Sequence, residues 1–117
     1  MQTRTKNSEK TGGHIDGATD NQYTMLEFEW DKNKADANLF KHGVAFQHAV
    51  KAFNDHFAIE LIDDRKDYGE ERITLIGMCD GILLHVTYTD RGERIRIISA
   101  RRAVKHEQEY YYHENSF

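Results

Sequence analysis

Alternating apolar and polar positions predict β-strands in two parts of the chain. Leu26–Trp30 alternates apolar with acidic residues, which is typical of a half-buried strand whose apolar side chains face inward. The same alternation predicts four more strands, over residues 57–62, 72–78, 82–89 and 94–100. The connections at Asp80-Gly81 and Asp90–Glu93 are so short that the strands they join must be antiparallel neighbours.

Helical patterns lie between and after these strands. Asp31 is a good N-cap for a helix running to about Lys41, and Gly43 can end that helix in the left-handed conformation. We expect the inward stripe of this helix to consist of Ala35, Leu39 and Phe40. A second helix is expected over residues 47–54 and a third over residues 102–112.

Together these elements predict an α+β domain built on one antiparallel sheet. Helices should cover one face of the sheet, and the other face should be at least partly open. We expect residues 25–117 to form this single domain. Residues 1–24 are polar, with isolated apolar side chains only, so we expect a disordered tail, either native or added to the protein.

The last predicted strand carries the main functional clue. Arg94, Arg96 and Ile98 should point to one side of it, whereas Ile95, Ile97 and Ser99 point to the other. Arg101 and Arg102 follow at the expected strand-to-helix junction. A guanidinium is permanently charged, and its planar fork matches the oxygens of a phosphate.

Charge makes this segment stand out. The chain has a formal net charge of −4, yet residues 91–105 contain six basic residues and one acid. An acidic protein of this kind does not coat polyanions in general, so any contact with nucleic acid must be local. The alternative is an ordinary solvated strand face whose arginines are neutralised by nearby acids.

The rest of the composition indicates the cellular compartment in which the protein is expected. Its one cysteine, Cys79, excludes an internal disulfide and fits a reducing compartment, and its place at a strand end favours a half-buried thiol without a chemical role. No apolar run is long enough to span a membrane, and the N-terminus has no apolar signal-peptide region. We therefore expect a soluble cytoplasmic protein that does not bind membranes.

Several side chains could serve RNA cleavage by transesterification. That reaction needs a base for the 2′-hydroxyl, an acid for the leaving 5′-oxygen and cations for the charged transition state, but no metal. The candidates outside the last strand are Lys41, His42, Glu71, Arg72, His85 and Tyr88. Each also has an ordinary structural explanation, such as a helix C-terminus for His42, a cross-strand ion pair for Arg72 and the core for Tyr88.

Metal and nucleotide motifs are weaker. The seven histidines include no His-x-x-x-His pair on a predicted helix, and a single cysteine excludes a zinc knuckle. Asp63, Asp64, Asp67 and Gly69 miss the spacing of a calcium loop, so a solvated acidic loop is expected. There is no P-loop and no dinucleotide fingerprint, so no cofactor and no metal are expected.

Short motifs from residue 26 to about residue 112 resemble those of the BrnT toxin family, in order and at matching spacing. The most specific of them are Lys41-His42-Gly43 and Ile97-Ile98-Ser99-Ala100-Arg101. The others are Phe28-Glu29-Trp30-Asp31, Asn33-Lys34, Asn38, Val44, Phe46, Ala49, Phe53-Asn54-Asp55, Glu70-Glu71-Arg72, Ile76-Gly77 and Arg94-Ile95-Arg96.

The resemblance implies more than the pattern itself. It implies a RelE-like ribonuclease fold, with two N-terminal helices on one face of the sheet and a C-terminal helix. It also implies a metal-independent ribonuclease that arrests bacterial growth as the toxin of a type II toxin–antitoxin pair. The implied partner is a BrnA-like antitoxin with a ribbon-helix-helix domain, which would inhibit the toxin in a hetero-oligomer and bind operator DNA.

Site residues follow from the motifs that match. The resemblance assigns catalysis to Lys41, His42, Glu71, Arg72 and Arg101. Contacts to phosphate or RNA are expected from Tyr88, Arg94, Arg96 and Arg102. The central expectation is that guanidinium groups from separate parts of the chain converge in one electropositive pocket. The alternatives are a non-catalytic module that binds an acidic partner or DNA within a repressor complex, or an inactive remnant of such a toxin.

Overall fold

The computed structural model describes residues 26–63 and 69–116. The predicted tail over residues 1–24 and most of the acidic loop lie outside the described residues. The elements are β1 (Glu27–Glu29), α1 (Lys32–His42), α2 (Phe46–Ala49), the 3-10 helix η3 (Val50–Asn54), β2 (Ile59–Asp63), β3 (Arg72–Cys79), β4 (Ile82–Asp90), β5 (Arg94–Arg102) and α3 (Lys105–Asn115). The predicted strands are therefore confirmed, with ends that differ by at most two residues.

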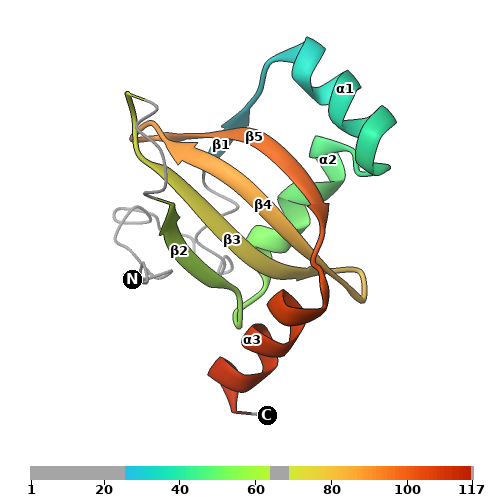
Figure 1. The fold of residues 1–117 in the computed structure, drawn as a ribbon. Helices are drawn as coiled ribbons and strands as arrows, with labels where there is room; N and C mark the ends of the chain where they lie inside the picture. Colours follow the sequence, from blue (N-terminus) through green and yellow to red (C-terminus); the bar gives the residue numbers. More distant parts are fainter. Residues whose placement is uncertain (1–25, 64–68, 117) are drawn as a thin grey trace, which may run out of the picture.

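The strands form one five-stranded sheet in the order β1-β5-β4-β3-β2 (Figure 1). Strands β2 to β5 form an antiparallel meander, as their short connections predict. The expectation of a purely antiparallel sheet is wrong, because β1 pairs in parallel with the first residues of β5. A parallel neighbour needs a long crossover, and here the rest of the fold provides it.

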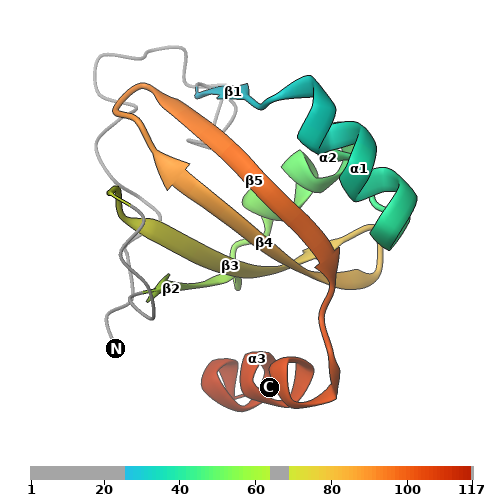
Figure 2. The same ribbon diagram turned by 45° about the horizontal axis from the view of Figure 1, so that its top comes forward.

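The N-terminal helices cover one face of the sheet, opposite α3 (Figure 2). Beneath α2 and η3 lies the larger core cluster, in which Phe46, Phe53 and Val86 are almost fully buried. Gly77 allows this close approach, because a Cβ on it would lie 2.7 Å from the carbonyl oxygen of Ala52 in η3. The core therefore tolerates no side chain at that position of β3.

Helix α1 has the predicted ends but not the predicted inward face. The Asp31 carboxylate accepts the N–H of Lys34 at 2.9 Å, and Gly43 has a φ of 71°. The expected apolar stripe is wrong, since Phe40 is 94% exposed and Leu39 is 49% exposed. The buried residue of α1 is Asn38 instead. Local capping chemistry fixed where the helix starts and stops, but not which side faces the sheet.

The side chain of Asn38 bonds to the backbone of β5 at a position where the strand has no neighbouring strand on that side. Its amide donates to the carbonyl oxygen of Ala100 at 2.8 Å and accepts the Ala100 N–H at 3.1 Å. A third bond runs to the carbonyl oxygen of Val44 at 2.9 Å. Because β1 pairs only with residues 94–96, this amide supplies the edge of β5 with hydrogen bonds that it otherwise lacks.

Helix α3 packs on the other face of the sheet and begins later than predicted. Arg101 and Arg102 belong to β5, not to a strand-to-helix junction. Tyr111 packs in a second buried cluster with Ile59, Ile76 and Leu83, and its hydroxyl donates to Asp55 at 2.7 Å. Because helices pack on both faces, only part of the second face is open. None of the helices in residues 26–63 and 69–116 is long and apolar enough to cross a membrane.

Candidate active site

A β-bulge in β5 decides which face of the sheet carries Arg101. Thr87 of β4 pairs with Ser99 and Tyr88 pairs with Ile97, so Ile98 has no partner on β4. Strict alternation would place Arg101 on the same side as Ile97, in the core beneath the N-terminal helices. The extra residue shifts the alternation, so that Ala100 is the buried residue and Arg101 shares the partly open face with Arg96.

On that face Arg101 lies beside a carboxylate of α3. Its Nη1 and Nη2 donate to the two carboxylate oxygens of Glu107, each at 2.9 Å. Glu107 also accepts the N–H of Val104 at 2.9 Å, which satisfies a free donor at the start of α3. His85, opposite Arg101 on β4, has its Nε2 3.7 Å from Glu107. We call His85, Arg101 and Glu107 the α3 end of the face.

Electrostatics hold this group together. Burial alone would raise the pKa of Glu107, but the hydrogen bonds from Arg101 and Val104 and the charges of His85 and Arg101 outweigh it, so that the pKa is lowered. Glu107 is 12% exposed and His85 is 17% exposed, whereas Arg101 is 33% exposed. The carboxylate is thus an anchored anion, and the guanidinium is the member that a ligand reaches most readily.

Arg101 keeps donors for a second anion. Its Nη1 uses both hydrogens, on Glu107 and on the carbonyl oxygen of Arg102, while its Nη2 uses one on Glu107. Among the described residues no acceptor binds the Nε–H or the other Nη2–H. These two donors form the remaining fork of the guanidinium, which has the geometry for two oxygens of one phosphate.

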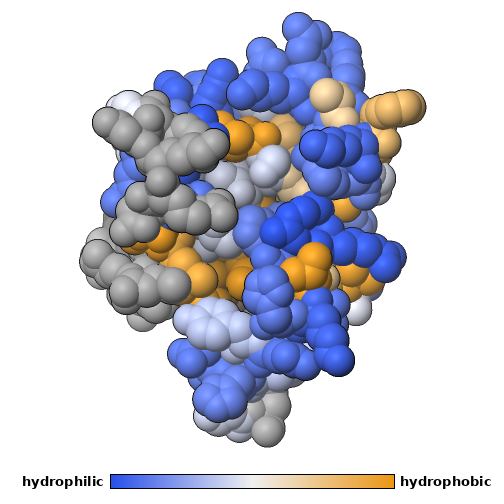
Figure 3. Space-filling view, viewed as in Figure 1, coloured by the Kyte–Doolittle hydropathy of each residue, from blue (hydrophilic) through white to orange (hydrophobic). Residues whose placement is uncertain are grey.

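The sheet offers hydroxyl groups beside this end. Thr87 pairs with Ser99 on β5 and with Thr74 on β3, and all three share the face of His85; Thr87 and Ser99 are partly exposed, whereas Thr74 is buried. Seen from this side, the surface over α1 and α3 is mostly hydrophilic, with some hydrophobic side chains over α1, and the hydrophobic surface between the two helices is broken into small patches (Figure 3). The face therefore favours a polar ligand over a large apolar partner.

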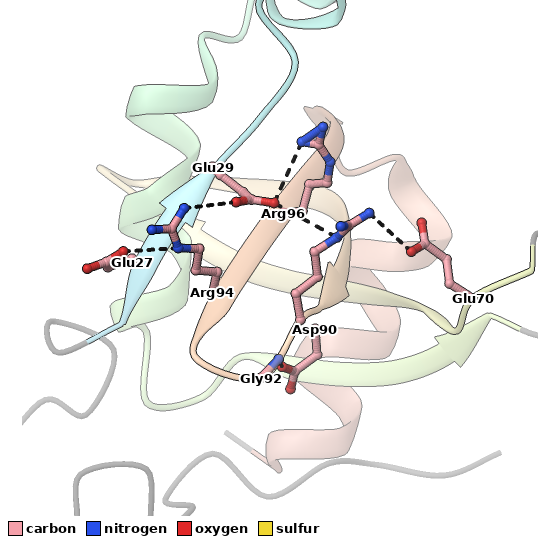
Figure 4. A network of polar contacts seen from close by, with 8 residues as sticks. Glu27, Glu29, Glu70, Asp90, Gly92, Arg94 and Arg96 are labelled. Carbon is pink, nitrogen blue, oxygen red and sulfur yellow. Dashed lines mark hydrogen bonds and ion pairs between the residues drawn. The ribbon is translucent and has the colours of Figure 1, made fainter.

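Arginines at the opposite end of the face are paired with acids (Figure 4). Arg94 lies 3.1 Å from Glu27 and 3.4 Å from Glu29. Glu29 is also 3.7 Å from Arg96. Arg91 lies 3.8 Å from Glu29 and 3.4 Å from Glu70. We call these three arginines and three glutamates the β1 end of the face.

The expectation of one convergent electropositive pocket is wrong. Arg101 lies opposite His85, whereas Arg96 lies opposite Thr89, four residues further along β4. At about 3.3 Å per residue the two positions are about 13 Å apart. Within the described residues, Arg94, Arg96 and Arg101 are each paired with at least one carboxylate. Arg94 and Arg96 are therefore paired with acids, as the alternative interpretation of this strand face expects, and their contact with RNA stays a prediction.

Two other predicted contacts lie on the helix-covered side. Tyr88 is 1% exposed, its ring packs on Phe53, and its hydroxyl donates to the buried Glu60, so it is a core residue and not part of the open face. Arg102 pairs with Leu84, a core residue beneath the N-terminal helices. Its exposed side chain therefore projects to the side opposite Arg101.

The remaining predicted catalytic residues lie in two separate places. Lys41, His42 and Glu71 are exposed, whereas Arg72 is partly buried. Lys41 and His42 are at the C-terminus of α1, and Glu71 precedes β3. Arg72, the first residue of β3, pairs with Asp63 of β2. Ile76 of β3 pairs with His85, which belongs to the α3 end. Arg72 comes four residues before Ile76, so it lies at the other end of β3, away from Arg101. The structure brings none of these four next to Arg101.

Sequence reasoning missed Glu107 and left His85 undecided. Glu107 is the third residue of α3, the position at which an acid bonds back to the start of a helix. That signal is present in the sequence, but it is hidden when the helix is expected to begin at residue 102. His85 could be placed only once the pairing of β4 was known.

Comparison with known protein families gives a match over residues 30–107, to the ribonuclease toxin BrnT of type II toxin–antitoxin systems. The chain belongs to the BrnT toxin family. The match ends at Glu107 and includes all of β3, β4 and β5. The α3 end of the open face therefore lies within the matched region, as do the arginines of the β1 end, whereas Glu27 and Glu29 precede it.

Membership in the BrnT family gives the open face a biochemical context. Type II toxins of this family are ribonucleases, so an RNA substrate and an antitoxin partner are implied for the chain. A comparison with curated proteins gave no significant match. The roles of individual residues must therefore be argued from the geometry of the α3 end.

Proposed function

We propose that this BrnT protein cleaves RNA at the α3 end of the open face, by metal-independent attack of a 2′-hydroxyl on the adjacent phosphate. The observation that carries the proposal is the group of His85, Glu107 and Arg101. It combines a proton-exchanging imidazole, an anchored carboxylate and a guanidinium with two unused donors. These are the components that the reaction needs at one phosphate.

Each group has a separate task in this mechanism. The Nε–H and the unused Nη2–H of Arg101 bind the scissile phosphate and stabilise the charge that develops on its oxygens. His85 takes the proton of the 2′-hydroxyl. Glu107 keeps Arg101 in place through two bonds of 2.9 Å and faces the imidazolium that forms on His85. The 2′-oxygen then forms the bond to phosphorus as the bond to the 5′-oxygen breaks.

A second group must protonate the departing 5′-oxygen. We assign this role to His42, supported by Lys41, because both match the BrnT motif. Asn38, about one turn before His42 in α1, bonds to Ala100, the residue before Arg101, so RNA bound at Arg101 would have to cross this edge of β5 to reach His42. Glu71 and Arg72 lie at the other end of β3. In this proposal they contact RNA further along the strand, with Thr87 and Ser99 between the two ends.

The biological role follows from the activity. A free toxin that cuts RNA in the cytoplasm arrests growth, and an antitoxin that covers the open face relieves the arrest. We propose that this antitoxin is BrnA-like, with a ribbon-helix-helix domain that carries the complex to operator DNA. In this account the RelE-like fold supplies the sheet on which the active site is built.

The products of RNA cleavage test the proposal. In EDTA, the purified chain should cut a short RNA and leave a 2′,3′-cyclic phosphate and a free 5′-hydroxyl, because no water enters the first step. The same RNA with one 2′-deoxy nucleotide before the cut should be resistant. Cleavage of the deoxy substrate, or dependence on a divalent cation, would contradict the mechanism. No cleavage at all would favour a non-catalytic module or an inactive remnant.

A further inference from the structure

Three possible metal ligands meet at the β3–β4 hairpin, away from the open face. His48 comes from α2, Cys79 ends β3, and Asp80 begins the turn that follows. Their ligand atoms all lie within 4.8 Å of one another. The Cys79 side chain belongs to the core cluster beneath the N-terminal helices, so the sheet separates this group from His85.

The spacing of these atoms resembles that of a tetrahedral zinc site. His48 Nε2 lies 3.4 Å from the Asp80 carboxylate. Zinc binds imidazole nitrogen and carboxylate oxygen at about 2.0–2.2 Å, so two such ligands stand about 3.4 Å apart around a tetrahedral ion. The Cys79 sulfur lies within 4.8 Å of both of these atoms, and it would move toward them to form a Zn–S bond of about 2.3 Å.

The charges of the group also suit a divalent ion. A thiolate and a carboxylate together neutralise Zn²⁺, and the neutral imidazole adds a third ligand of the kind that zinc prefers over magnesium or calcium. One cation competes for the position, since Lys51 Nζ lies 3.1 Å from Asp80. Lys51 is 55% exposed on a flexible side chain and can turn into solvent when an ion arrives.

We propose that His48, Cys79 and Asp80 bind one Zn²⁺ ion, with water as the fourth ligand. The Cys79 thiol loses its proton to the solvent as the Zn–S bond forms. The ion then joins α2 to the β3–β4 hairpin and shields the sulfur from oxidation. The ion takes no part in RNA cleavage, because the site lies on the opposite face of the sheet from the cleavage chemistry.

Cobalt provides a direct test, because Co²⁺ takes zinc sites and a Co²⁺–thiolate bond absorbs in the near ultraviolet. We expect the full chain, first stripped by a chelator, to give this absorption on titration with Co²⁺ and to lose it on addition of Zn²⁺. Zn²⁺ should also raise the melting temperature of the stripped protein. Cys79→Ser should abolish the absorption band.

Matched variants distinguish a specific zinc site from nonspecific zinc binding. His48→Gln should weaken Zn²⁺ binding by at least the ~10–100-fold that is typical for loss of a supporting residue at a metal site. Lys51→Ala should strengthen it, and His56→Gln, which removes another exposed histidine, should leave it unchanged. His48 and Lys51 are exposed, so these variants should fold even if Cys79→Ser does not.

Three results would overturn the proposal: no thiolate band in the wild-type protein, equal affinity in His48→Gln, or weaker binding in Lys51→Ala. RNA cleavage serves as an independent measurement. Because the two sites lie on opposite faces, cleavage in EDTA should be the same for wild type and His48→Gln. The ribonuclease proposal and the zinc proposal can therefore fail separately.

Discussion

The two ends of the open face are both built from arginines and glutamates, yet they differ in what the pairing leaves for a ligand. At the α3 end one half-buried guanidinium is held by one carboxylate, which is itself fixed to the start of α3. At the β1 end three arginines share three glutamates at 3.1–3.8 Å, and Arg94 is 57% exposed. Arg96 is 31% exposed, close to the 33% of Arg101, so the burial of the arginines does not separate the two ends. A count of positive charges would favour the β1 end, whereas the bidentate geometry and the deeper burial of Glu107 favour the α3 end.

The difference shows that an ion pair can either orient an arginine for ligand binding or occupy its donors so that a ligand cannot bind. A bidentate pair orients a guanidinium and leaves its other fork available, at a position where the dielectric is low enough for charge to matter. The more exposed pairs at the β1 end, those of Arg91 and Arg94, are screened by water and contribute about 0–1 kcal/mol each. We therefore expect substitutions at the two ends to differ by orders of magnitude in their effect on cleavage.

The largest effect is expected for His85→Gln. Glutamine keeps a polar side chain but cannot exchange the proton, so kcat/KM for RNA cleavage should fall by about 10²–10⁴-fold. His106→Gln, an exposed histidine in the first turn of α3, is the matched control and should retain activity. Equal losses in both variants, with unchanged circular dichroism, would remove His85 from the mechanism.

Glu107→Gln should also have a large effect, because it releases Arg101 from its fixed position. A displacement of about 1 Å at a catalytic group can cost about 10²-fold in rate. Stability should change with pH as well. The lowered pKa of Glu107 means that its contribution to folding is present above about pH 4.3 and is lost as the pH falls further.

The pH effect can be measured with urea denaturation midpoints between about pH 3 and pH 7. The wild-type protein should lose more stability on acidification than Glu107→Gln, since the glutamine has no proton to take up. Parallel curves for the two proteins would show that the Glu107 carboxylate contributes nothing to folding. That outcome would also weaken its assignment as the anchor of Arg101.

A smaller effect in the opposite direction is expected for Glu29→Gln. This change removes the carboxylate that lies within 4 Å of Arg91, Arg94 and Arg96. RNA should bind a few-fold more tightly, and the salt dependence of binding should steepen by about 0.7 in the log–log slope for one added phosphate contact. Glu109→Gln changes the net charge equally on α3 and should not reproduce the change in slope.

The smallest effect is expected for Arg94→Ala. Its partners, Glu27 and Glu29, are shared or exposed, so the free energy of unfolding should fall by only about 0.2–1 kcal/mol. Cleavage of RNA should remain within about twofold of wild type, which is the level expected for a screened surface charge. A loss comparable to that of His85→Gln would place the reaction at the β1 end instead.

Much of the fold could be predicted because its signals are local. The alternation of β1, the Asp31 cap and the turn at Asp80-Gly81 each depend on residues close in sequence, and each was confirmed. The inward face of α1 could not be predicted in the same way. Asn38 is buried because it bonds to the edge of β5, which lacks a strand partner there. Its bonding partner, Ala100, is 62 residues later in the sequence, so no local pattern indicates this contact.

The candidate site was harder to predict for one physical reason. The position of Arg101 depends on the bulge at Ile98, and a shift of one residue moves every later side chain to the other face. The sequence contains a hint, since apolar residues at 95 and 97 are followed by Ala100, which breaks the alternation. A single alanine is too small a signal to decide the register without the partner strand.

The most direct test compares the same substitution at the two ends. Arg101→Lys and Arg96→Lys both keep the positive charge and remove the planar fork, so they differ only in location. We predict that single-turnover cleavage of a short RNA in EDTA falls by about 10²–10³-fold for Arg101→Lys and changes by less than about threefold for Arg96→Lys. Equal rates for the two variants, or a greater loss at Arg96, would contradict the assignment of the active site to the α3 end.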